Sequence, residues 1–181
     1  EPTAAPLGEG LGPMEPKGKM LIDMGGGTTE LGVLSYGRLV VHHSLRIAGN
    51  TLDRSIRRRI KRDHSLAIGI DTAEDLKKNL LSALNMKHGE VMTVTGMDLA
   101  EGRPREIEVT GYQIFEYCEK SLRRLMDMII DSIQTIPPQL LADVVDGGVL
   151  LTGGGALIPH LAERIAQETG FEVYRGDKVL T

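Results

Sequence analysis

The sequence has very little cysteine and few aromatic residues. Its 181 residues include one cysteine, no tryptophan, two phenylalanines and four tyrosines. One cysteine cannot close a disulfide within the chain, and it cannot build a cysteine-based zinc site by itself. This usage fits a reducing compartment, where thiols stay reduced.

The sequence also lacks a large excess of charge of one sign and lacks long apolar runs. The 21 basic and 25 acidic side chains leave a net charge of −4, which offers no general attraction to nucleic acid or to an anionic membrane. No apolar run reaches the ~20 residues that span a bilayer. The apolar content of 41% is enough for the core of one moderate domain or of two small lobes.

Glycine is abundant, with 22 residues, and two glycine clusters each follow an apolar run that is typical of a buried strand. Backbone without a Cβ lets several N–H groups approach a phosphate or a sugar, so both turns favour a nucleotide ligand. The clusters are Gly25, Gly26 and Gly27 after residues 19–24, and Gly153, Gly154 and Gly155 after residues 148–152.

Asp23 precedes the first cluster, and Thr28 follows it with a hydroxyl group. A carboxylate beside bound phosphate would repel it unless a divalent cation or its water shell lay between them. Asp23 is therefore predicted to bind Mg²⁺ through water. The alternative is a tight hairpin turn that requires three glycines for its geometry alone.

The second cluster precedes a predicted helix at Ala156. It does not satisfy GxGxxG, because Ile158 occupies the sixth position from Gly153, and no GxxxxGK[ST] occurs in the chain. Dinucleotide and Walker-type sites therefore lose their main support. A turn that only starts a helix remains the alternative.

The apolar patterns predict an α/β fold with a mixed sheet. Three consecutive strands indicate an antiparallel meander, and the late strand, helix and strand indicate a right-handed parallel crossover. The predicted strands are 19–24, 30–35, 38–45, 91–95, 107–110, 148–152 and 171–174. One predicted helix starts at Asn50 or Thr51, and the other predicted helices span residues 71–84, 112–136 and 156–169. Residues 2–16 are predicted to be a connector, and Ser35, Tyr36 and Gly37 a turn.

Taken together, the two clusters resemble the second phosphate loop and the adenosine loop of the actin, sugar-kinase and heat-shock-chaperone ATPase superfamily. Within it the chain resembles the second domain of the MreB family of bacterial actins. The resemblance rests on both clusters and on residues 1–5, 15–18, 47–53, 72–74, 98–105 and 148–157.

The resemblance implies an actin-like, ribonuclease H-like domain in which a small α+β subdomain, residues 50–110, interrupts a large subdomain, residues 1–49 and 111–181. It also implies bound ATP and Mg²⁺. The implied phosphate and magnesium contacts are Asp23, Gly25, Gly26, Gly27 and Thr28, and the implied nucleoside contacts are Gly153, Gly154, Gly155 and Ala156 together with Glu74, Asp75, Leu76 and Lys77. Asp75 stands where the family usually has Arg, which reverses a charge beside the nucleoside.

The implied function is that of a cytoskeletal protein that polymerises with copies of itself and directs cell shape and wall synthesis. The family acts in the cytoplasm, at the inner face of the cell membrane, with cell-shape membrane proteins as partners. Its first phosphate loop, its water-positioning carboxylate and its membrane-binding segment lie in the first domain. We therefore expect this chain alone to bind ATP weakly and to lack the weak ATPase activity of the whole protein.

Two alternatives within the superfamily stay open, a sugar kinase and a chaperone-like ATPase. A sugar kinase is not favoured, because no catalytic-carboxylate motif follows the first cluster. A chaperone-like ATPase would need a peptide-binding domain after the ATPase, on which this chain is not informative. The basic run of residues 57–62 lacks interleaved aromatics, and we interpret it as a solvated or filament-facing helix in preference to a nucleic-acid site. Neighbouring His42 and His43 point to opposite faces of a strand and cannot share a metal.

Overall fold

The computed structural model describes residues 18–36, 38–87 and 89–176. The predicted connector, residues 2–16, and Gly37 of the predicted turn lie outside the described residues. The chain divides into two compact units, Glu1–Gly49 with Arg123–Thr181, and Asn50–Leu122.

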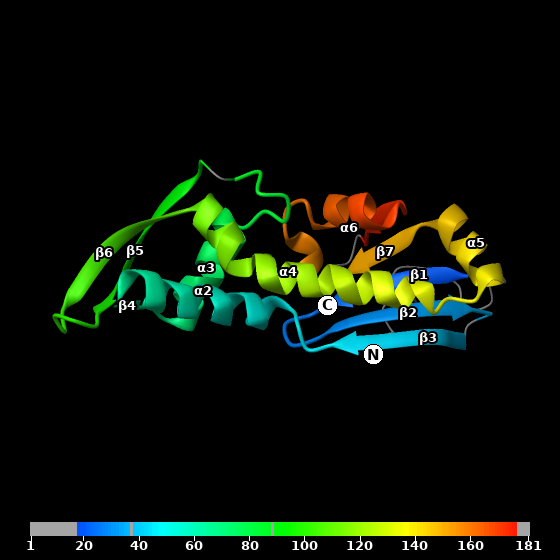
Figure 1. Ribbon diagram of the computed structural model, residues 1–181, viewed down its shortest axis with the longest axis horizontal. Helices are drawn as coiled ribbons and strands as arrows, with labels where there is room; N and C mark the ends of the chain where they lie inside the picture. Colours follow the sequence, from blue (N-terminus) through cyan, green and yellow to red (C-terminus); the bar gives the residue numbers. More distant parts are fainter. Residues whose placement is uncertain (1–17, 37, 88, 177–181) are drawn as a thin grey trace. The chain divides into compact units, whose positions relative to one another are not determined.

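The first unit contains a five-stranded mixed sheet in the order β3-β2-β1-β7-β8 (Figure 1). Strands β1, β2 and β3 form the predicted antiparallel meander, while β7 pairs in parallel with both β1 and β8. The predicted mixed sheet is therefore confirmed. The strands are β1 Lys19–Met24, β2 Thr29–Ser35, β3 Arg38–Leu45, β7 Val149–Thr152 and β8 Val173–Arg175.

Helices α5 (Pro138–Gly147) and α6 (Leu161–Thr169) and the later part of α4 (Gly111–Gln134) belong to the same unit. The sequence predicts one helix from Ala156 to Thr169, but the chain first forms a 3₁₀ turn, η1, over Gly154–Leu157. Pro159 explains the interruption, because a residue before proline avoids the helical region and Ile158 is extended, with φ −62° and ψ 120°.

The second unit pairs α2 (Gly49–His64) and α3 (Ile70–Leu80) with an antiparallel sheet in the order β4-β5-β6. Its strands are β4 Leu66–Ala67, β5 Val91–Asp98 and β6 Pro104–Thr110. The β5–β6 hairpin is longer than predicted. Asp98 stabilises its tip, since its carboxylate accepts hydrogen bonds from the backbone N–H groups of Ala100 and Glu101 and pairs with Arg105 at 2.6 Å.

The border between the units falls inside α4, after Leu122, whereas the sequence places it near Thr110. The first half of α4 packs within the second unit. There Tyr117 is buried beneath the guanidinium of Arg59, 5.0 Å from the ring centroid, and Cys118 is fully buried. Burial raises the pKa of the Cys118 thiol, so this cysteine serves the core of the unit.

Among the described residues, no helix is both long enough and apolar enough to traverse a lipid bilayer.

Two leucines in the sheet of the first unit, one buried and one exposed, provide a matched test of how this sheet is packed. Leu31 of β2 is 0% exposed, while Leu39 of β3 is 37% exposed. We expect Leu31→Ala to lower the free energy of unfolding by about 2–5 kcal/mol, because it removes buried apolar contacts and leaves a cavity. Leu39→Ala is expected to change it by less than about 0.5 kcal/mol. Urea unfolding followed by circular dichroism measures both, and equal losses would contradict this sheet.

Candidate functional site

The two glycine clusters lie at the same edge of the sheet. Strands β1 and β7 are parallel neighbours, with Asp23 paired in register with Thr152, so both strands end together. The turn of residues 25–28 follows β1, and the turn of residues 153–156 follows β7. The crevice beyond the carboxyl ends of parallel strands is where open α/β sheets commonly bind their ligands.

The first turn is held by its own backbone. The N–H of Gly25 donates to the carbonyl of Thr28 at 3.0 Å, and the N–H of Gly49, where α2 begins, donates to the carbonyl of Gly25 at 3.3 Å. Just beyond the turn, the hydroxyl of buried Thr29 donates to the carbonyl of Ile47 at 2.6 Å. The turn is therefore fixed both to the sheet and to the start of α2.

The fold itself does not require glycine at positions 25 and 27 of this turn. None of its three glycines has a positive φ. A Cβ built on Gly25 would find only the carbonyl oxygen of Thr28, at 3.5 Å, and one on Gly27 would meet nothing within 4 Å. Hairpin geometry alone therefore does not explain Gly25 and Gly27. Their open side faces solvent, since Gly26, Gly27 and Thr28 are exposed.

The second turn is different. Gly153 has φ 80° and ψ 172°, a conformation that is essentially restricted to glycine, and a Cβ there would lie 2.5 Å from the carbonyl oxygen of Met24. A Cβ on Gly155 would collide with the side chain of Met24. Geometry thus explains Gly153 and Gly155. Gly154 is exposed with an open Cβ position, while Ala156 is fully buried and packs in the interior.

Asp23 lies between the two turns. Its carboxylate adjoins Gly153, and its sheet partners Glu30 and Thr152 share its face. Within the part of the chain that the structure describes, no hydrogen bond or ion pair engages this half-buried carboxylate. No group of three or more His, Cys, Asp or Glu side chains able to hold a metal ion occurs among the described residues. Among the described residues, the Asp23 carboxylate is therefore without a partner and outside any such group.

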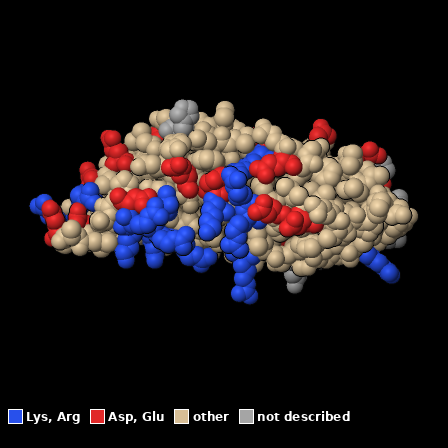
Figure 2. Space-filling model, viewed as in Figure 1, with Lys and Arg blue, Asp and Glu red and all other residues tan. Residues whose placement is uncertain are grey.

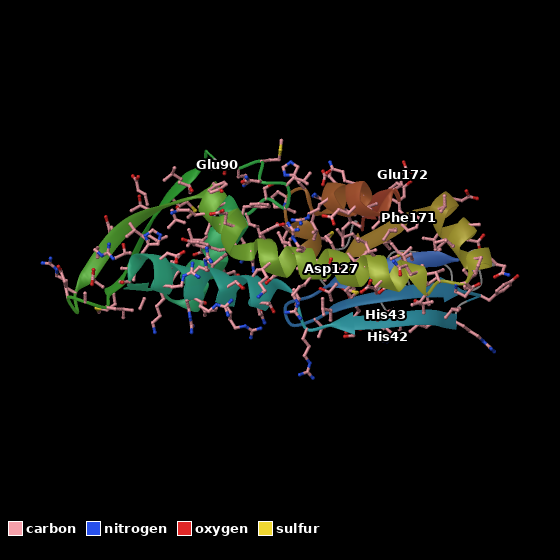
Figure 3. All side chains as sticks on the ribbon, in the orientation of Figure 1. His42, His43, Glu90, Asp127, Phe171 and Glu172 are labelled. Atoms are coloured by element: carbon pink, nitrogen blue, oxygen red, sulfur yellow. The ribbon has the colours of Figure 1, made fainter. Side chains whose placement is uncertain are left out.

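Glu30 is a polar residue of this region that sequence reasoning missed. Its carboxylate accepts a hydrogen bond from Ser44 at 2.7 Å and lies 2.6 Å from Nε2 of His42. The Ser44 hydrogen bond, and then His42, lower the pKa of Glu30. His43 points to the opposite face, where its ring lies 3.2 Å from the hydroxyl of Thr135, so the two histidines diverge as predicted (Figure 3).

The remaining predicted site residues, Glu74 to Lys77, belong to α3 of the second unit. Leu76 is fully buried and serves the core of that unit. Glu74 pairs with Lys78 at 2.9 Å, which lowers the pKa of its carboxyl, and Asp75 is exposed.

Lys77 is the constrained member of this set. Its ammonium lies 2.8 and 2.9 Å from the two carboxylate oxygens of Asp53 on α2, and the two side chains are only 12% and 5% exposed. Burial raises the pKa of Asp53, and Lys77 opposes this effect. The pair is separated by 24 positions in the sequence and gives no local signal.

Comparison with known proteins decides the family. The model of the MreB/Mbl protein family matches residues 1–181. The chain belongs to the MreB/Mbl family. It is 36% identical over 168 residues to the cell shape-determining protein Mbl of Bacillus subtilis, covering 93% of this chain and 50% of Mbl. It is 36% identical over 181 residues to the cell shape-determining protein MreB of Escherichia coli, covering 100% of this chain and 52% of MreB. The chain thus spans about half the length of these MreB/Mbl relatives.

Solved structures give the same family fold. MreB5 of Spiroplasma citri, crystallised with ADP, is 32% identical and superposes with a TM-score of 0.93 over 99% of this chain and 54% of MreB5. The MamK double helical filament has a TM-score of 0.69 at 20% identity, over 87% of this chain and 49% of MamK, and supports the fold alone. The predicted actin-like fold and the resemblance to MreB are confirmed.

Adding a methyl group should affect the stability of the two turns very differently. Gly153→Ala is expected to lower the free energy of unfolding by at least about 2 kcal/mol, because the backbone conformation and Met24 both oppose a Cβ. Gly27→Ala is expected to change it by less than about 0.5 kcal/mol, because its Cβ position is open. Urea unfolding of both variants tests this difference. A stable Gly153→Ala protein would contradict the packing of the second turn against β1.

The Asp53–Lys77 pair predicts a large loss of stability on truncation. Asp53→Ala would leave a buried ammonium group without its partner and is expected to cost about 3–5 kcal/mol. Glu74→Gln, which breaks the solvent-exposed pair on the same helix, is the control and should leave the melting temperature unchanged. Thermal unfolding measures both. A melting temperature that is unaffected by Asp53→Ala would show that Lys77 reaches solvent freely.

Proposed function

We propose that this chain forms one wall of the ATP site of a filament-forming MreB/Mbl protein. One observation supports this proposal above all. The half-buried carboxylate of Asp23 lies between two glycine turns, at the shared end of β1 and β7, and has no partner among the residues that the structure describes. The related MreB5 structures contain ADP or AMPPNP.

The first turn suits the phosphates. The exposed backbone of Gly26 and Gly27 and the hydroxyl of Thr28 are available as donors, and the missing Cβ atoms let an anion approach. The start of α2 is bonded to the same turn through Gly49, and a helix N-terminus attracts negative charge.

Asp23 suits a hydrated magnesium ion. Mg²⁺ keeps several of its waters and is commonly bound by one or two carboxylates together with substrate phosphates. A single carboxylate beside the phosphate turn fits a contact made through water. When bound, the ion would neutralise charge on the phosphates, while Asp23 would orient its water shell.

The second turn suits the nucleoside. Gly154 offers an open surface, and Gly153 holds the turn against β1, whereas Gly155 and Ala156 support it from inside. Contacts from Glu74, Asp75 and Lys77 remain a prediction from the family resemblance. The side chain of Leu76 is buried and would act only by holding α3 in place.

In the cell we propose that the protein assembles with copies of itself and takes part in determining cell shape at the inner face of the membrane. The names of its relatives, MreB and Mbl, describe cell shape-determining proteins. Family membership favours this function over a sugar kinase or a chaperone-like ATPase. Contact with membrane proteins and with the membrane surface would involve the family's first domain.

Titration with Mg²⁺ and AMPPNP, followed by amide NMR of the chain, tests the site. Because the chain spans about half of its relatives' length, we expect weak binding, with shifts at residues 23–28 and 153–154. Asp23→Asn should weaken Mg²⁺ binding roughly ten- to hundredfold and leave the magnesium-free shifts in place.

Asp127→Asn, which removes an exposed carboxylate on α4, is the control for the same change of charge and should give the magnesium-dependent shifts of the unaltered chain. Shifts confined to other elements, or an identical magnesium response in Asp23→Asn, would refute the proposed site.

A further inference from the structure

Helix α2 carries a row of cations on its exposed face. Arg54, Arg57, Arg58 and Lys61, which we call the cationic ridge, occupy positions i, i+3, i+4 and i+7 of the helix and are all exposed. The opposite face of α2 is buried through Leu52, Ile56 and Ile60. Figure 2 shows lysine and arginine gathered over α2.

The ridge has few acidic neighbours in the described part of the chain. Among the described residues, no ion pair engages Arg57, Arg58 or Lys61. Arg59 and Arg62 differ, since both pair with Asp63, at 3.4 and 2.6 Å. The chain has a net charge of −4, so this concentration of positive charge contrasts with its overall composition.

A groove with complementary charge lies in the first unit, between β3 and the later part of α4. It has a volume of about 300 Å³ and is lined by His43, Arg124, Asp127, Met128, Asp131 and Ser132. Asp127 and Asp131 are exposed, and within the described part of the chain neither has an ion-pair partner. Figure 3 shows Asp127 on α4 and His43 on β3.

The two surfaces match in spacing as well as in charge. Arg57 and Lys61 are four residues apart on one helix, and Asp127 and Asp131 are four residues apart on another. One helical turn advances about 5.4 Å, so each carboxylate of the groove can face one cation of the ridge. Arg124, one turn before Asp127, would repel a ridge that extended over it, which restricts how α2 can lie.

We propose that the cationic ridge of one copy docks on the Asp127–Asp131 groove of a second copy. This inference deepens the proposed function and rests on it, because it names a contact through which a filament could form. Since the two surfaces are different, the contact is heterologous, and such contacts extend into open assemblies when they do not close into rings.

A second copy fits the ridge better than nucleic acid or lipid. All exposed residues of α2 are polar, so the ridge has neither an aromatic platform for bases nor an apolar anchor for a bilayer. A complementary acidic surface, in contrast, is present on every copy of the chain.

Sedimentation velocity of the chain over a range of concentrations tests the contact. We expect salt-sensitive self-association, weaker at roughly 500 mM than at roughly 50 mM salt. The double reversal Arg57→Glu/Lys61→Glu, and separately Asp127→Lys/Asp131→Lys, should each lower the association constant about tenfold. Arg38→Glu/Lys120→Glu makes the same change in net charge at exposed positions outside the ridge and should have no effect.

Charge exchange is the decisive arm. An equimolar mixture of the two double variants, and the quadruple variant alone, should both recover association, because the opposite charges meet again. The proposed contact would be overturned if the double variants lost association and their mixture did not recover it. It would also be overturned if the control variant lost association equally, or if the unaltered chain did not associate. Binding of the ridge to phosphatidylglycerol vesicles or duplex DNA, with self-association unchanged by its reversal, would also overturn it. Melting curves verify that each variant is folded.

The nucleotide titration keeps the two proposals distinguishable. Variants of the ridge should retain the amide shifts at residues 23–28, since they leave both turns intact. If charge exchange restores association but no nucleotide binding is seen, the contact is supported and the nucleotide site is refuted. If nucleotide binds but charge exchange does not restore association, the site is supported and the contact is refuted.

Discussion

The parallel pairing of β1 with β7 is the constraint on which the candidate site depends. It aligns Asp23 with Thr152 and therefore ends both strands at one edge of the sheet. Two glycine turns that are separated by more than a hundred residues in the sequence become neighbours there, and Gly153 packs directly against Asp23 and Met24. A shift in this register would separate the available carboxylate from the second turn.

The two glycine turns share a sequence pattern but differ in physical role. At Gly153 and Gly155 a side chain would collide with β1, so glycine serves the fold. At Gly27 the fold would accept a side chain, so the open space is available to a ligand. From the sequence alone, the glycines of each turn could serve either the backbone conformation or the access of a ligand. The structure shows that backbone conformation and packing account mainly for the glycines of the second turn.

The local pattern of apolar and turn residues predicted the strands and helices well where their bounds depend on nearby residues. Strands β1 and β3 have their predicted bounds, because apolar runs and a turn define them. The start of α6 was mispredicted, because Pro159 acts through the conformation of the residue before it. Contacts distant in sequence gave no signal. The Asp53–Lys77 pair, the burial of Leu76 and the packing of early α4 with α2 all depend on tertiary structure.

In the proposed site, both turns contact one hydrated metal–nucleotide complex. Replacing Mg²⁺ with paramagnetic Mn²⁺ in the presence of AMPPNP tests it most directly, because the broadening of amide signals falls steeply with distance from the ion. We expect simultaneous broadening at Asp23, at residues 25–28 and at residues 153–154. Broadening scattered over other exposed carboxylates, with these turns unaffected, would contradict it.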